Sequence, residues 1–258
     1  MVSAVFFSSC SKKESKDLSS GKTKISATFF PLYVMLLNIT EGADVELSML
    51  APANTGCLHD YQLTTKDMKV IEECDILVVN GAGMEDFLDK ALSIKKDSTV
   101  IASEGYDLLT EEGSLQPNAH VWVSLEGAVY EVNKITQGLC ALDAKSAELY
   151  KKNAESYVKK IKSLQTRMQS ELSLLKGRSV ITFHEAFPYF AKEFSLNTIA
   201  VVEREPGTEP TACAASSITF NPYLLAISFI VSISADLPCR CTAMIAFVLS
   251  VIFSSTFV

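Results

Sequence analysis

Apolar or small side chains recur at alternating spacings of three and four residues through the segment 143–176. The positions are Ala147, Tyr150, Ala154, Tyr157, Ile161, Leu164, Met168, Leu172 and Leu175. This spacing lays them along one stripe of an α-helix, for which Asp143 is a suitable N-cap and Gly177 a suitable stop. At a rise of ~1.5 Å per residue the helix would be about 50 Å long, which predicts a rod that joins two lobes.

The alternative for this segment is a coiled-coil dimer arm. The stripe has Ala and Tyr where a coiled-coil seam favours Leu and Ile, and no heptads continue beyond it. We therefore expect the stripe to pack against both lobes of a monomer.

Short β-rich runs alternate with helical stretches on both sides of this segment. We expect strands at 24–28, 45–49, 76–80, 99–102, 179–183 and 197–202, and helices at 31–40, 65–74, 84–93 and 186–194. Strands that alternate with helices predict βαβ units and a mainly parallel sheet. The predicted fold class is α/β, with two Rossmann-like α/β lobes joined by one long helix and the second lobe incomplete.

Composition predicts how the chain is divided. The expected parts are a lipoprotein signal remnant and linker at 1–23, an N-terminal lobe at 24–142, the linking helix at 143–176, the start of a C-terminal lobe at 177–210 and an atypical apolar tail at 211–258. The first ten residues are apolar, end in Cys10 and resemble the end of a bacterial lipoprotein signal, in which the cysteine becomes lipidated. The usual basic start of a signal is missing, so either the true start lies upstream or the signal is defective. The alternative is a buried N-terminal strand with a chance cysteine.

The tail differs from the rest of the chain because only Asp236 and Arg240 are charged after Thr211. Its apolar runs, 223–233 and 243–258, are shorter than the ~20 residues that span a bilayer. One interpretation is a membrane-associated or hairpin tail. The other, which we favour, is that the reading frame is lost near Thr211, since the second lobe is left with only two strands.

The 258 residues carry a formal net charge of -7, which excludes nucleic acid as an expected partner. Seven cysteines at irregular spacing, with no C-x-x-C, indicate neither a disulfide framework nor a cysteine zinc finger. The chain has three histidines, His59, His120 and His184, each where a strand ends or a loop turns toward a helix. Two lobes joined by a rod would bring them to one cleft. Three imidazoles suit Zn²⁺, although they also suit Cu, Ni and Fe.

Three segments around these histidines resemble the ligand motifs of metal-binding solute-binding proteins of ABC transporters, the zinc and manganese receptors of the ZnuA/TroA type. The segments are Gly56-Cys57-Leu58-His59-Asp60-Tyr61-Gln62, Asn118-Ala119-His120-Val121-Trp122 and Thr182-Phe183-His184-Glu185-Ala186-Phe187. Segments 75–88 and 204–210 are also similar, so the resemblance covers 24–210 in the expected order. The family fold, two α/β lobes joined by one long helix, agrees with the predicted rod.

The resemblance implies that His59, His120 and His184 bind the metal. Manganese-type members tend to carry a carboxylate at the third position, so His184 favours Zn²⁺ over Mn²⁺. The family's fourth ligand is an acidic residue late in the second lobe, and no residue of this chain matches it. A water molecule or Asp60 are the alternatives for that position, and Cys57 is a weaker candidate ligand.

The implied function is an extracytoplasmic receptor that captures a divalent transition metal and delivers it to an ABC permease. Such a protein would be periplasmic or at the cell surface, anchored to the membrane through lipidated Cys10. An enzyme is not expected, because neither His-Glu-x-x-His nor a serine nucleophile elbow occurs. The alternatives are a nonfunctional truncated or frameshifted remnant of such a receptor and, more weakly, a zinc-dependent hydrolase with Glu185 beside the metal.

Overall fold

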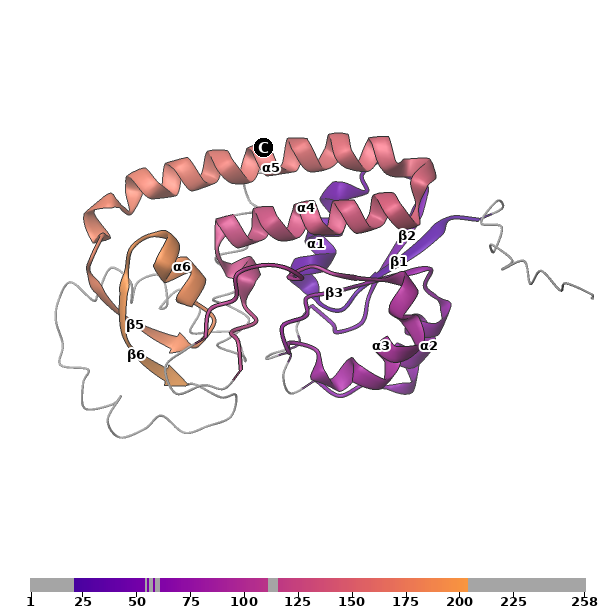
Figure 1. The fold of residues 1–258 in the computed structure, drawn as a ribbon, viewed down its shortest axis with the longest axis horizontal. Helices are drawn as coiled ribbons and strands as arrows, with labels where there is room; N and C mark the ends of the chain where they lie inside the picture. The colour runs from indigo at the N-terminus through magenta and orange to yellow at the C-terminus, as the bar shows by residue number, and fades with distance from the viewer. Residues whose placement is uncertain (1–20, 54, 56–57, 59–60, 111–115, 204–258) are drawn as a thin grey trace, which may run out of the picture.

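The computed structural model describes residues 21–53, 55, 58, 61–110 and 116–203. These residues form two parallel sheets with helices packed around them (Figure 1). The first sheet has the strand order β2-β1-β3-β4, and every neighbouring pair is parallel. Its strands are β1 (Thr23–Ala27), β2 (Val45–Met49), β3 (Ile76–Val79) and β4 (Thr99–Ile101). The predicted α/β class with parallel sheets is therefore confirmed.

The central strand β3 is apolar throughout and mostly β-branched, as is typical of a parallel strand that is buried on both faces. Successive side chains alternate between the faces, so Ile76 and Val78 enter one core cluster and Leu77 and Val79 another. The first cluster includes side chains of α1 and α4, and the second those of α2 and α3. These helices are α1 (Phe30–Ile39), α2 (Thr65–Glu73), α3 (Asp89–Lys95) and α4 (Leu125–Leu142).

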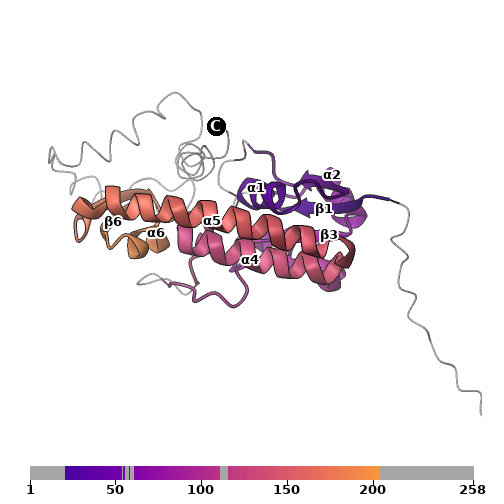
Figure 2. The ribbon, with the colours of Figure 1, turned by 90° about the horizontal axis from the view of Figure 1, so that it is seen from above.

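The long helix α5 (Ala147–Glu171) lies along α4 and extends from the first sheet to the second (Figures 1 and 2). Its buried residues all belong to the predicted stripe: Tyr150, Ala154, Tyr157, Ile161 and Leu164. They share one core cluster with α1 and α4. The stripe is thus covered by the same chain, which contradicts the coiled-coil alternative.

The continuous α5 helix is shorter than the segment 143–176. It is flanked by the 3-10 turns η5 (Ala144–Ser146) and η6 (Ser173–Leu175). Asp143 is not its N-cap, because this residue already closes α4 as its C-cap, where the chain turns back. Its carboxylate instead accepts a 2.7 Å hydrogen bond from the Tyr150 hydroxyl.

The second sheet pairs β5 (Ser179–His184) with β6 (Asn197–Glu203) in parallel, connected by α6 (Pro188–Glu193). Ala186, Phe187 and Phe194, around α6, are buried in the same cluster as α4 and α5. The second lobe therefore packs onto the first through α6. No helix in the described part of the chain is both long and apolar enough to cross a membrane. Cys10 and the tail 211–258 lie outside the described residues.

Candidate metal site

His120 stands in the segment that leads into α4, directly before the 3-10 turn η4 (Val121–Val123). Its residue is 3% exposed. The backbone N–H donates to Oδ1 of Asn118 at 3.0 Å, and the ring Nδ1 lies 3.1 Å from the same oxygen. An amide oxygen only accepts, so this contact places the imidazole proton on Nδ1. Nε2 is then the nitrogen through which the ring would bind a cation.

His184 is the last residue of β5, at the carboxyl end where parallel sheets place ligand sites, and it is 5% exposed. Its ring meets that of His120 edge to face, with centroids 5.1 Å apart and planes at 89°. Trp122 lies beside the pair, its ring centroid 5.2 Å from that of His120. The structure therefore brings two of the three predicted histidines together, one from each lobe.

Two polar side chains join the lobes beside these rings. Nδ2 of Asn118 donates to the carbonyl oxygen of Glu185, in the other lobe, at 2.8 Å. The Tyr189 hydroxyl, on α6, donates to the carbonyl oxygen of Asn118 at 2.6 Å and accepts from the N–H of Leu109 at 3.0 Å. These bonds fix residues 118–120, the His120 segment, relative to the residues that follow His184.

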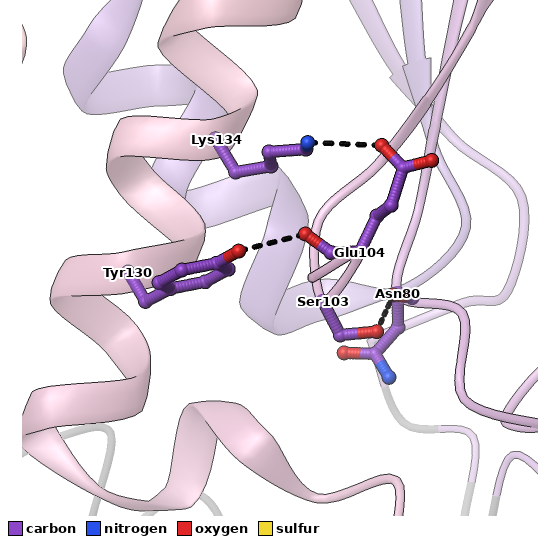
Figure 3. Close-up of polar contacts among 5 residues, drawn as sticks. All are labelled: Asn80, Ser103, Glu104, Tyr130 and Lys134. Atoms are coloured by element: carbon purple, nitrogen blue, oxygen red, sulfur yellow. Dashed lines mark hydrogen bonds and ion pairs between the residues drawn. The ribbon is translucent and has the colours of Figure 1, made fainter. Parts of the chain in front are cut away.

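A second set of polar contacts supports the His120 segment from within the first lobe. Asn80, after β3, donates from Nδ2 to the carbonyl oxygen of Ala119 at 2.9 Å. Asn80 is in turn bound through its carbonyl oxygen, which accepts from the Ser103 hydroxyl at 2.7 Å (Figure 3). The next residue, Glu104, is bound to α4 by the contacts shown in Figure 3: its carbonyl oxygen accepts from Tyr130 at 2.8 Å, and its carboxylate pairs with Lys134 at 2.9 Å.

Two buried carboxyl groups lie under this part of the site. Glu85 accepts hydrogen bonds from the N–H groups of Asn80 and Gly81 and from the Thr28 hydroxyl, at 2.7 to 2.9 Å. Burial nevertheless raises the pKa of Glu85 to about 6. Glu131, on α4, is fully buried, and neither of its carboxyl oxygens has a hydrogen-bond partner among the described residues. Burial, with the Glu85 carboxyl nearby, holds the pKa of Glu131 well above its ordinary value.

The remaining predicted site residues, His59, Cys57 and Asp60, lie outside the described residues. Leu58 and Tyr61, which flank them, are described. Leu58 is buried in the main core cluster, and Tyr61 donates from its hydroxyl to Asp67 at 2.9 Å. Within the described ranges no group of three His, Cys, Asp or Glu side chains is arranged to hold a metal. The metal role of the three histidines therefore stays a prediction, as do the domain boundaries.

The residues that support the imidazoles carry little local signal in the sequence. Asn118 lies in the motif 118–122, and its place two residues before His120 is the one sequence feature that indicates a supporting role. Tyr189 has no such signal, because it looks like an ordinary helical residue and its hydrogen-bond partners lie 71 and 80 residues away.

Two α/β lobes are spanned by one long helix, and one imidazole from each lobe lies against the other where the lobes meet. The family model for ZnuA, described as zinc-uptake complex component A, periplasmic, matches residues 25–220. The chain belongs to this family, which confirms the resemblance seen in the motifs.

The relatives agree with this assignment. The zinc-binding protein AdcA of Streptococcus pyogenes serotype M6 is 31% identical over 234 residues, which cover 81% of this chain and 45% of AdcA. The high-affinity zinc uptake system protein ZnuA of Bacillus subtilis is 30% identical over 227 residues, 81% of this chain and 70% of ZnuA. The Zn(II)-bound ZnuA-like domain of Streptococcus pneumoniae AdcA is 28% identical with a TM-score of 0.67, covering 81% of this chain and 76% of that one. The chain thus spans less than half the length of the AdcA proteins it matches.

Proposed function

We propose that this chain is a receptor that captures a divalent transition metal outside the cytoplasmic membrane and delivers it to an ABC permease. Its cargo is Zn²⁺ in preference to Mn²⁺, and its ligands are His59, His120 and His184. The observation that carries the proposal is the edge-to-face pair of His120 and His184, whose centroids are 5.1 Å apart. Two imidazoles bound to one tetrahedral Zn²⁺ at ~2.0–2.1 Å would hold their centroids about 5 Å apart.

His59 is proposed as the third ligand because its neighbour Leu58 is buried in the same cluster as Ala119 and Ala186. Ala119 adjoins His120, and Ala186 lies two residues after His184. The fourth position of a tetrahedral site would be filled by water or by Asp60.

Imidazole nitrogen favours Zn²⁺ over Mn²⁺, which prefers oxygen ligands. Relatives that are named as zinc-binding or zinc-uptake proteins support the same cargo. Capture and release change no covalent bond, so the proposed role needs no catalytic group. The family description supports a periplasmic location, and we propose that a lipid on Cys10 anchors a monomer to the membrane.

Calorimetric titration of the full chain with Zn²⁺ and Mn²⁺ tests the proposal. We expect Zn²⁺ to bind more tightly than Mn²⁺, and His59→Ala, His120→Ala and His184→Ala each to weaken Zn²⁺ binding by at least about tenfold. Lys152→Ala, at an exposed position of α5, is the control and should bind as the parent does. Unchanged zinc heat in a His120→Ala/His184→Ala chain would reject the site. Absence of zinc heat in the parent would favour a nonfunctional remnant.

A further inference from the structure

Glu193, the last residue of α6, forms hydrogen bonds with two other helices, α4 and α5. Its Oε2 accepts hydrogen bonds from the backbone N–H groups of Leu125, at 2.8 Å, and Glu126, at 3.4 Å. Its Oε1 accepts from Nε2 of Gln165, on α5, at 2.6 Å. One carboxylate of the second lobe therefore binds both the start of α4 and the linking helix. Figures 1 and 2 show α6 beside this end of α4, under α5.

The contact suits the chemistry of a helix start. The first N–H groups of a helix have no partner within it, and the helix dipole makes that end attractive to a carboxylate. Ser124, the N-cap of α4, satisfies one of them by accepting from Gly127. Glu193 satisfies two others, and it does so from another lobe.

Short, largely buried links connect this contact to the two imidazoles. Between His120 and α4 lies only η4 with Ser124, and all four of these residues are 3% exposed or less. Between His184 and α6 lie Glu185, which is partly exposed, and the buried residues Ala186 and Phe187, 0% and 9% exposed. A displacement of α6 relative to the start of α4 would therefore be transmitted to both rings, because closely packed links have little room to absorb it.

We propose that Glu193 is a positioning residue for the metal site. Glu193 holds the His184 segment, residues 184–187, against the His120 segment, so that the imidazoles face each other before metal binds. This inference rests on the proposed function. The Glu193 contact would preorganise the site. Because the two imidazoles are already ordered in the metal-free protein, metal binding does not have to offset the entropy cost of ordering them.

The test compares Glu193→Gln with Glu171→Gln in the full chain. Glu171 is an exposed glutamate near the end of α5 and serves as the matched control. Glutamine keeps the shape of Glu193 but removes the charge that the start of α4 binds. We expect Zn²⁺ affinity to fall about tenfold in Glu193→Gln and to stay unchanged in Glu171→Gln. Glu193→Asp, which restores the charge on a shorter side chain, should recover part of the loss.

Two further readouts separate positioning from stability. Co²⁺ bound in place of Zn²⁺ should give a visible absorption spectrum that differs between the parent and Glu193→Gln, because the ligand geometry changes. Urea unfolding of the metal-free chains measures the stability change separately. Should Glu193→Gln not fold, Gln165→Ala removes the contact to Oε1 and is expected to weaken Zn²⁺ binding less, but in the same direction.

The outcomes are distinguishable. If the parent binds zinc and the folded variants at 193 and 165 bind it as tightly as Glu171→Gln, with the parent's Co²⁺ spectrum, the positioning role is overturned while the proposed function stands. If the parent binds no zinc, both fail.

Discussion

The two parallel sheets of the molecule differ in how completely they are buried. In the first sheet every residue of β3 is 2% exposed or less, because helices cover both faces. In the second sheet Ile199 of β6 is 58% exposed. Among the described side chains of β5 and β6 only Val180 and His184 are buried. The first lobe thus holds its strands by its own core, whereas the described part of the second lobe depends on contacts with its neighbour.

This difference extends to the two imidazoles. His120 is supported by residues of its own lobe, since Asn118 contacts its ring and Asn80 binds the preceding carbonyl group. His184 ends a strand of the second lobe, which is joined to the first by α6, by Tyr189 and by Glu193. The geometry between the rings is therefore set mainly by contacts between the lobes.

The largest expected effect tests the difference in burial directly. Leu77→Ala in β3 should lower the free energy of unfolding by about 3 kcal/mol, because it leaves a cavity at a residue that is 0% exposed. Ile199→Ala in β6 removes a similar side chain that is 58% exposed, and should change it by less than about 0.5 kcal/mol. Urea unfolding of the two metal-free variants measures both. Equal losses would mean that β6 is covered in solution, and the contrast between the sheets would not hold.

The buried Glu131 carboxyl lowers the stability of the first lobe. We expect Glu131→Gln to raise the free energy of unfolding by about 2 kcal/mol at pH 7.5, because the parent must keep a proton on a buried carboxyl without hydrogen-bond partners among the described residues. Glu155→Gln, at an exposed position of α5, is the control and should be neutral.

The pH dependence gives the sign of this effect. The folded pKa of Glu131 is raised by burial and the Glu85 carboxyl, so its contribution to stability is fully present below the unfolded value of ~4.3 and is lost as pH rises through the folded value. The advantage of Glu131→Gln should therefore grow from pH 4 to pH 8 in urea unfolding curves. A difference that is constant over this range would show that Glu131 is ionised in the folded chain.

Much of the fold could be predicted because burial leaves a local pattern. The α5 stripe and the apolar run of β3 follow the periods of a helix and a buried strand, and β2 was predicted with its exact bounds. The predicted helix at 84–93 begins late, with a 3-10 turn at Asp86–Leu88 and α3 from Asp89. The Glu85 carboxylate binds the nearby N–H groups of Asn80 and Gly81 and the distant Thr28 hydroxyl, so this stretch turns before it becomes helical.

The site was predictable only in part for a related reason. His120 and His184 are rare residues at strand and loop ends, so topology alone suggested that they meet. The groups that hold them have no such signal. Glu193 binds residues 67 and 68 positions away, and no local period connects α6 with the start of α4.

The smallest expected effect concerns the ion pair between Lys134 of α4 and Glu104, which is part of the first lobe's own support for the site (Figure 3). The two side chains are 28% and 64% exposed, so water and salt screen their attraction. Lys134→Met should lower the free energy of unfolding by only about 0.5 kcal/mol. In 0.5 M NaCl, where the Debye length is roughly 4 Å, this difference between parent and variant should be smaller still. The Tyr130 hydroxyl still binds the Glu104 carbonyl in this variant, so Zn²⁺ affinity should not change. A clear loss of zinc affinity would contradict this account, because it would show that the His120 segment depends on a surface charge rather than on burial in its own lobe.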